Sequence, residues 1–256
     1  MAIITLTTDY GRSDYYQAAL KGSLYRLCPS ATVVDISHQV NPFDIVNAAY
    51  LLKNSYKNFP LGSIHIVCVD NGQIQGRDYL LLEEKGQYFI GRDNGIFSLV
   101  FEERLGEAIK LNAKDFEPFV LNNYLGRVSK HILDKKPIEE LGEKLSAIRE
   151  VLTIQPVISP NEIRASIAQV DHYGNVITNL HQTLFESIWK HRAFNIYLKK
   201  NEELNIISTR FESAPVGELV AIFNNSGYLM IGINMGNAAT LLSLKKDDII
   251  QIEFKD

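Results

Sequence analysis

An acid and a guanidinium lie close together where one apolar run of the first quarter of the chain ends. The stretch HIVCVDNGQIQGR, residues 65–77, reaches Asp70, turns at Asn71-Gly72 and arrives at Arg77 seven positions after the carboxylate. A carboxylate can orient a water or accept its proton, whereas a guanidinium stays charged and only donates hydrogen bonds. The pair therefore either forms a structural ion pair in a loop or holds a reacting water.

Two earlier apolar runs also end on carboxylates. AIITLTT is followed by Asp9, and ATVV is followed by Asp35. In an open parallel sheet, ligands bind beyond the carboxyl ends of the strands. A carboxylate there accepts two hydrogen bonds from a vicinal diol such as that of ribose, and it can equally cap the next helix. Both interpretations stay open for Asp9, and a structural role is favoured for Asp35.

Two later segments are dense in amides and glycines, VDHYGNVITN at 170–179 and FNNSGYLMIGINMGNAA at 223–239. Amide side chains donate and accept hydrogen bonds at once, which suits the edge of a purine or the ends of an amino acid. Hairpin turns at Tyr173-Gly174-Asn175 and Ser226-Gly227 are the alternative interpretation. That alternative explains each Asn-Gly pair singly, but it does not explain why so many amides occur together.

Several common types of site are not indicated. The chain has no G-x-G-x-x-G after its first apolar run, no P-loop and no G-x-S-x-G elbow. Its six histidines show no metal-ligand spacing, so we expect no metal site and no cofactor. A net charge of −4, without a basic stretch, argues against nucleic acid or a membrane surface as a partner.

The cellular location is predicted from cysteines and from hydropathy. Cys28 and Cys68 each lie in an apolar stretch, which is typical of buried thiols in a cytoplasmic protein. No apolar run approaches the roughly 18 residues that a membrane span needs, and the polar N-terminus is unlike a signal peptide. We expect a soluble, cytoplasmic protein.

The elements that carry these residues alternate between strand and helix. Strand and helix patterns follow in the order β-α-β-α-β over residues 2–8, 13–29, 31–37, 41–60 and 63–70. This order predicts an α/β fold with a mostly parallel sheet flanked by helices. Antiparallel strands are expected over 79–101 and helical structure over 125–145. After a boundary near 153–160 the patterns are mainly short strands, so we predict domains at 1–153 and 160–256.

Six blocks in one order give the whole pattern a resemblance to a known family. They are TLTTDYGRSDYYQAALKG, VVDISHQVNPFDIVNAAYLL, IHIVCVD, GRDNGIFS, VDHYGNVITNL and NNSGYLMIGINMGNAA. The chain resembles, from Thr5 to Ala239, the S-adenosyl-L-methionine (SAM) hydroxide adenosyltransferases. These are SAM hydrolases that form adenosine, and they are related to the fluorinases and chlorinases.

The resemblance implies a fold, an assembly and a set of binding residues. It implies an N-terminal α/β domain and a smaller, β-barrel-like C-terminal domain. It also implies a homotrimer with each active site between one subunit's N-terminal domain and its neighbour's C-terminal domain. The matching positions would bind SAM as the substrate. Asp9 would bind the ribose diol, and Phe43 would pack near the sugar. The methionine end would be bound by Asp171, Asn225 and Ser226, the adenine by Tyr173 and Asn175, and the adenine edge by the backbone of Ile233, Asn237 and Ala238.

The catalytic part of the resemblance is less complete. In these hydrolases an Asp-Arg-His set orders the attacking water, and Asp70 and Arg77 match its first two members. The family's Phe-His-Gly-Arg-Asp stretch corresponds to YLGRV here, so the histidine position falls on Leu125. The family's Asp-Pro-Gly-Val-Gly loop reads DNGQI, and Met230 stands where many relatives carry Glu. His131, six residues after Leu125, is the candidate replacement for the missing histidine.

The expected reaction is attack of water or hydroxide at ribose C5′ of SAM, with neutral methionine leaving. Loss of an orienting group typically slows such a step by about 10²–10⁴-fold, so the missing histidine predicts an impaired SAM hydrolase. One alternative is a protein that binds SAM or adenosine with weak or lost catalysis. A weaker one is a different nucleophile such as halide, which the negative charge of Asp70 would repel.

Overall fold

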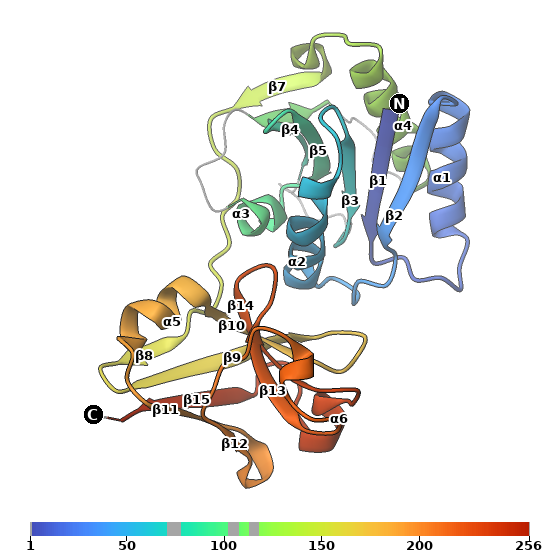
Figure 1. Cartoon of the computed structure of the whole chain (residues 1–256). Coiled ribbons are helices and arrows are strands. Elements are labelled where there is room, and N and C mark those ends of the chain that lie inside the picture. Colours follow the sequence, from blue (N-terminus) through green and yellow to red (C-terminus); the bar gives the residue numbers. More distant parts are fainter. Residues whose placement is uncertain (1, 71–77, 102–107, 113–117, 256) are drawn as a thin grey trace. The chain divides into compact units, whose positions relative to one another are not determined.

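The computed structural model describes residues 2–70, 78–101, 108–112 and 118–255, with the side chains of α4 described from 121 onward. Arg77 lies outside the described residues. The chain divides into two compact units, Met1–Leu152 and Thr153–Asp256. Each is an α/β or β-rich body of its own, and both are drawn in Figure 1.

A seven-stranded mixed sheet forms the centre of the first unit. Its order is β2-β1-β3-β5-β4-β6-β7. The strands are β1 (Ala2–Thr8), β2 (Ala31–Ser37), β3 (Ile64–Cys68), β4 (Tyr79–Glu84), β5 (Gln87–Arg92), β6 (Ala108–Leu111) and β7 (Gly142–Leu145). The pairs β1–β2, β1–β3 and β3–β5 are parallel, and the other three are antiparallel. The carboxyl ends of β1, β2, β3 and β5 therefore meet at one edge of the sheet.

Helices cover both faces of this sheet, as the sequence predicted (Figure 1). Side chains of α1 (Tyr16–Leu27) and α4 (Pro118–Leu133) share one buried cluster with Ile64 and Ile66 of β3. Side chains of α2 (Ile45–Ser55) and α3 (Ile96–Val100) share the other with Val67. Successive residues of β3 thus face opposite layers, because side chains alternate along a strand. The α/β prediction is confirmed.

Two boundaries differ from the sequence-based expectation. Residues 96–100 were expected as a strand and instead form α3, which follows Gly95 with φ +94°. The helical structure expected over 125–145 ends at Leu133; a 3₁₀ turn, η2 (Ile138–Leu141), and strand β7 follow. Short segments of this length carry little periodicity, so pairing with β6 decides the conformation of β7.

The second unit is an eight-stranded antiparallel sheet that nearly closes into a barrel. Its order is β12-β11-β15-β9-β10-β14-β13, with β8 paired to β9. Ser208, just after β12, bridges Ile222 of β13, and its N–H donates to Ala221 O at 2.7 Å, which draws the two ends of the sheet together. The barrel-like expectation is confirmed.

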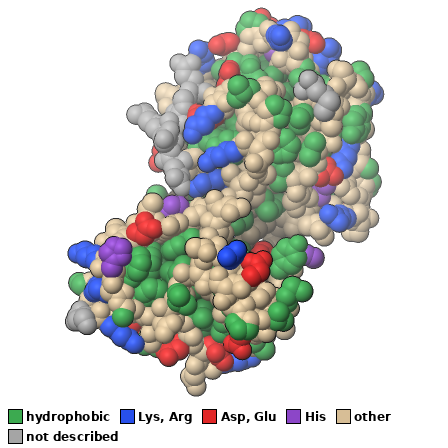
Figure 2. All heavy atoms as spheres, viewed as in Figure 1, with side chains coloured by type: hydrophobic (Ala, Val, Ile, Leu, Met, Phe, Trp, Pro, Cys, Tyr) green, Lys and Arg blue, Asp and Glu red, His purple; other side chains and the backbone are tan. Residues whose placement is uncertain are grey.

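The elements of this unit enclose one apolar cluster. The strands are β8 (Val157–Ser159), β9 (Glu162–Val170), β10 (Val176–His181), β11 (Phe194–Tyr197), β12 (Glu203–Leu204), β13 (Leu219–Phe223), β14 (Tyr228–Ile233) and β15 (Ile249–Phe254), and the helices are α5 (Gln182–Trp189) and α6 (Ala238–Leu242). Figure 2 shows acidic and basic side chains interspersed over the visible faces of both units.

Candidate active site

The carboxyl edge of the first sheet brings together three residues that the sequence singled out. Asp9 follows β1 directly, and its Oδ2 accepts the backbone N–H of Phe43 at 3.1 Å and that of Asp70 at 3.1 Å. The N–H of Asp9 in turn donates to Cys68 O, at the end of β3, at 3.3 Å. One carboxylate oxygen therefore joins the segments that follow β1, β2 and β3.

Two of these residues have an uncommon backbone conformation. Phe43 has φ +66° and Asp70 has φ +53°, in the left-handed region that residues with a Cβ rarely occupy. The aromatic side chain of Phe43 is 69% exposed. Such conformations typically cost about 1–3 kcal/mol each and persist where surrounding contacts hold them, often at functional sites. The hydrogen bonds to Asp9 are such contacts.

A series of polar contacts lies directly beside Asp9, buried at Thr8 and His38 and exposed where Lys21 meets Asp35. Thr8 Oγ1 is 2.8 Å from His38 Nδ1, His38 Nε2 is 3.0 Å from Asp35 Oδ1, and Lys21 Nζ is 2.6 Å from Asp35 Oδ2. Thr8 and His38 are buried. Burial alone would raise the pKa of Asp35, but the hydrogen bonds from Lys21 and His38 bring it below its usual value. Asp35 thus makes the structural contacts that the sequence favoured.

Sequence reasoning missed two buried residues at the end of β5. Asn94 donates from Nδ2 to Val69 O at 3.1 Å and accepts Ile96 N–H at 3.2 Å, which fastens the residue before Asp70 to the start of α3. The Arg92 guanidinium is buried 5.1 Å over the ring of Tyr79, whose pKa burial raises well above its usual range. The Asn94-Gly95 pair had indicated only a turn, and a single sequence gives no sign that such an asparagine is buried.

In the second unit, the loop between β9 and β10 is built around Asp171. Its Oδ1 accepts the N–H groups of Tyr173 and Asn175, each at 2.9 Å, and its Oδ2 accepts Asn175 Nδ2 at 2.9 Å. Asn175 is buried, whereas the Tyr173 side chain is 75% exposed. The hairpin-turn alternative is therefore correct for the local geometry of this loop, and it leaves the tyrosine ring open to a ligand.

The same loop touches the start of α6. Gly174 has φ +82°, and a Cβ there would lie 2.1 Å from the Asn237 side chain. Asn237 caps α6 by accepting Thr240 N–H at 2.8 Å, and Ala239 N–H donates to Gly174 O at 2.9 Å. Asp171, Tyr173, Asn175, Asn237 and Ala238 are thus gathered at one place, beside the buried Ile233.

Asn225 and Ser226 are not part of that group within the second unit. They form the turn before β14, where Asn224 Oδ1 accepts the N–H groups of Ser226 and Tyr228, each at 3.0 Å. Ile233 is the last residue of β14 and Asn237 follows the strand, whose six residues span roughly 20 Å. The predicted contacts of Asp171 and of the Asn225-Ser226 pair with the methionine end therefore lie at opposite ends of this strand.

The position assigned to the family histidine lies in the core. Leu125 is fully buried between α4 and the sheet, in the cluster that holds Leu20 and Leu24 of α1. His131, the candidate replacement, bonds through Nε2 to Pro137 O at 2.8 Å, in the last turn of α4. Both side chains are therefore engaged in contacts of the α4 layer.

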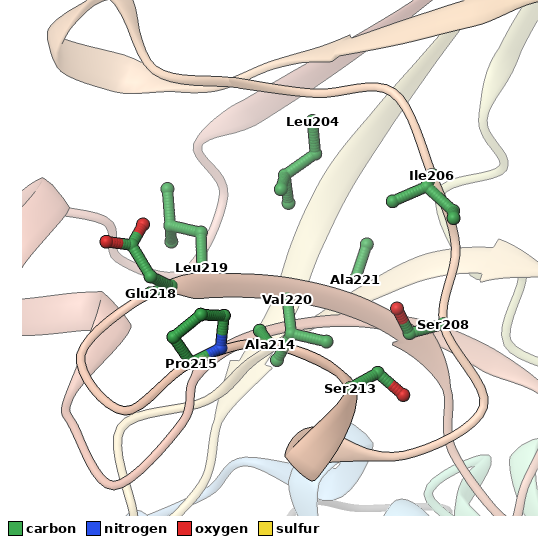
Figure 3. A pocket seen from close by; sticks show the side chains of 10 residues that line it. All are labelled: Leu204, Ile206, Ser208, Ser213, Ala214, Pro215, Glu218, Leu219, Val220 and Ala221. Atoms are coloured by element: carbon green, nitrogen blue, oxygen red, sulfur yellow. The ribbon is translucent and has the colours of Figure 1, made fainter.

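The described residues form neither a metal-binding cluster nor a membrane-spanning helix. In those parts of the chain no group of three or more His, Cys, Asp or Glu is arranged to hold a metal, and no described helix is long and apolar enough to span a membrane. A hollow of about 420 Å³ lies at the seam between β12 and β13, lined in part by Leu204, Ser208 and Glu218 (Figure 3). It contains none of the predicted site residues.

The comparisons with known proteins cover both units. Residues 4–142 match the model of the SAM hydroxide adenosyltransferase N-terminal domain, and residues 165–251 match that of the C-terminal domain. A Methanocaldococcus jannaschii protein named (R)-S-adenosyl-L-methionine hydrolase is 30% identical over 98% of this chain and 95% of its own. A fluorinase from Actinopolyspora mzabensis is 24% identical over 98% and 96%.

A solved structure agrees with these matches. The crystal structure of a conserved protein from Thermotoga maritima has a TM-score of 0.84 and 27% identity, and the match covers 98% of this chain and 99% of that one. Both family models match in chain order, and together they take in every described residue singled out above for the site. The chain belongs to the SAM hydroxide adenosyltransferase family.

Proposed function

We propose that the protein hydrolyses S-adenosyl-L-methionine to adenosine and L-methionine. The observation that carries this proposal is the full-length similarity to proteins named (R)-S-adenosyl-L-methionine hydrolase, together with the carboxylate edge at which Asp9 joins Phe43 and Asp70. The name of those relatives specifies the R epimer at the sulfonium centre, so we propose that epimer as the substrate.

Asp9 and Phe43 are proposed to bind the ribose. Asp9 is half-buried at the edge where ligands of open sheets bind, and a carboxylate matches a vicinal diol. The exposed ring of Phe43 offers an apolar surface to the sugar. Tyr173, Asn175 and the backbone near Ile233, Asn237 and Ala238 are proposed to bind the adenine, with Asp171, Asn225 and Ser226 toward the methionine.

In the proposed reaction, the oxygen of a water molecule bonds to C5′ as the C5′–S bond breaks. The electron pair of that bond goes to sulfur, which leaves as the neutral thioether of methionine. The water proton passes to Asp70 or to solvent. A sulfonium is already a good leaving group, so the protein must orient one water and exclude others, and Arg77 would hold Asp70 or the water by charge-assisted hydrogen bonds.

We also propose the assembly and setting that the family resemblance implied. They are a cytoplasmic homotrimer without a cofactor, whose domains are residues 1–153 and 160–256 and whose sites form between neighbouring subunits. The two groups of predicted binding residues, one in each compact unit, are compatible with such sites.

The test is to incubate the purified protein with each sulfonium epimer of SAM in ¹⁸O-labelled water. Hydrolysis predicts adenosine carrying ¹⁸O at O5′ and an equal amount of methionine, with Asp70→Ala inactive. Saturable binding without products would instead indicate a binding protein. A 5′-halogenated adenosine, formed only when halide is added, would indicate halide as the nucleophile, since fluorinases are among the relatives. The absence of both SAM binding and SAM turnover would refute the proposal.

A further inference from the structure

His38 takes no part in the proposed reaction, although it lies beside the residue proposed to bind the ribose. Its ring is 3% exposed, and both ring nitrogens lie within hydrogen-bond distance of a side chain, Nδ1 to Thr8 at 2.8 Å and Nε2 to Asp35 at 3.0 Å. Thr8 is the last residue of β1 and immediately precedes Asp9. His38 thus joins the carboxyl ends of β1 and β2 through side chains.

The hydrogen-bonding groups of Asp35, His38 and Thr8 can be assigned as donors and acceptors. The Asp35 carboxylate can only accept hydrogen bonds, and its Oδ1 lies 3.0 Å from His38 Nε2, so a proton on Nε2 suits this contact. In that tautomer Nδ1 accepts a hydrogen bond from the Thr8 hydroxyl at 2.8 Å. The Thr8 oxygen in turn accepts the N–H of Tyr10 at 3.3 Å. Thr8 thus links the His38 ring to the backbone of Tyr10.

Backbone hydrogen bonds extend the same link to the loop that carries Phe43. His38 O accepts Gly11 N–H at 2.8 Å, and Thr8 O accepts Val40 N–H at 3.4 Å. The segments on both sides of Asp9 and the first residues after β2 are therefore fixed to each other. Asp9 Oδ2 then reaches the N–H groups of Phe43 and Asp70, each at 3.1 Å.

We infer that His38, acting through Thr8, is a positioning residue for this site: it fixes the orientation of the Asp9 carboxylate, and Asp9 holds the backbone of Asp70. The part that concerns turnover rests on the proposed SAM hydrolysis. His38 touches neither substrate nor water in this role. Its effect is on geometry, because a carboxylate that shifts loses both backbone donors at once.

Thr5, three residues before Thr8 on β1, provides a matched control for the Thr8–His38 contact. Thr5 Oγ1 is 2.7 Å from His65 Nδ1, and both side chains are fully buried, as in the Thr8–His38 pair. Thr5→Val and Thr8→Val therefore delete the same kind of buried hydroxyl–imidazole bond. Only the second deletion lies next to Asp9.

The experiment compares Thr8→Val, Thr8→Ser and Thr5→Val by amide hydrogen exchange and by kcat on SAM. We expect Thr8→Val to speed exchange at the Phe43 and Asp70 amides about ten-fold or more and to lower kcat by a similar factor. Thr8→Ser keeps the hydroxyl and should stay near the wild type. Thr5→Val should leave both readouts near the wild type even where it lowers the melting temperature.

Unchanged exchange at Phe43 and Asp70 in Thr8→Val, or an equal change in Thr5→Val, overturns the inference. If the wild type does not hydrolyse SAM, the proposed function fails, and the exchange measurement still decides whether Thr8 and His38 position Asp9. If Thr8→Val does not fold, His38→Gln is tested in its place. The glutamine amide can still donate to Asp35, whereas Thr8 loses the Nδ1 atom as its acceptor.

Discussion

At the scale of single residues, Asp9 is both the proposed ribose-binding carboxylate and an acceptor of two backbone hydrogen bonds. We expect Asp9→Ala to destabilise the protein by roughly 1–3 kcal/mol, because the N–H groups of Phe43 and Asp70 lose their acceptor. Asp9→Asn keeps a carbonyl acceptor, so it should recover most of that stability while the KM for SAM stays at least about ten-fold high. Urea unfolding and steady-state kinetics measure the two effects. Equal stability of wild type and Asp9→Ala would contradict the structural part.

His65 gives the protein a pH-dependent stability. Its ring is fully buried and stacked on Phe89 with centroids 4.8 Å apart, and burial lowers its pKa from 6.5 to about 4. Between these values the unfolded chain binds more protons than the folded one, so stability falls as the pH drops. His65 alone should lower the free energy of unfolding by about 2 kcal/mol at pH 5 relative to pH 7.

The measurement is the free energy of unfolding in urea at pH 7 and pH 5, for wild type and for His65→Gln. Between pH 7 and pH 5 the free energy of unfolding should fall by about 2 kcal/mol more in the wild type than in His65→Gln. His191→Gln, at an exposed histidine, is the control and should lose as much as the wild type. Parallel curves for wild type and His65→Gln would show that His65 is not the titrating group.

At the scale of elements, the buried face of α4 limits what a substitution at Leu125 can do. We expect Leu125→His to destabilise the protein by about 2–5 kcal/mol, because it removes a core side chain and buries a polar ring. It should not raise SAM turnover. Leu125→Met, of similar volume, should cost less than about 1.5 kcal/mol. Thermal unfolding and adenosine formation report the two effects, and a stable variant with faster turnover would place this position at the active site after all.

The contact between the 171–175 loop and α6 can be tested with two glycines. Gly174 and Gly217 have similar φ values, +82° and +87°, but a Cβ would collide with Asn237 only at Gly174, since nothing lies within 4 Å at Gly217. Gly217→Ala should cost about 1 kcal/mol for backbone strain alone. Gly174→Ala should cost more and also weaken adenosine binding, measured by calorimetry. Equal costs with unchanged binding would mean that the loop and α6 move apart freely.

The sequence predicted elements better than it predicted how site residues group. Polar residues after apolar runs correctly placed Asp9 and Asp70 at one sheet edge, because parallel strands end together. The sequence did not show that Asn225 and Asp171 lie at opposite ends of β14, because the order of residues along the chain does not specify how the strands pair. It also missed Asn94, because burial depends on packing between β5 and α3. Residues 71–77, which include Arg77, lie outside the described residues.

At the scale of the whole molecule, the proposed sites between subunits make a prediction about mixed assemblies. The described candidate residues of the first unit are Asp9, Phe43 and Asp70, and those of the second include Asn175 and Asn237. Asp70→Ala and Asn175→Ala chains should each be nearly inactive alone. If a site takes one unit from each of two neighbours, random co-assembly restores about a quarter of the sites, because each site draws its two units from different chains.

The measurement is SAM turnover after the two variants are unfolded together, refolded at equal ratio and checked for size by light scattering. Recovery near a quarter of the wild-type rate, with a mass of three chains, supports shared sites in a trimer. The same two variants refolded separately and then mixed are the control, and they should stay inactive while subunits do not exchange. A site confined to one chain always contains one of the two lesions, so co-refolding would then restore no activity, and the proposal of shared sites would fail while hydrolysis by the wild type still stood.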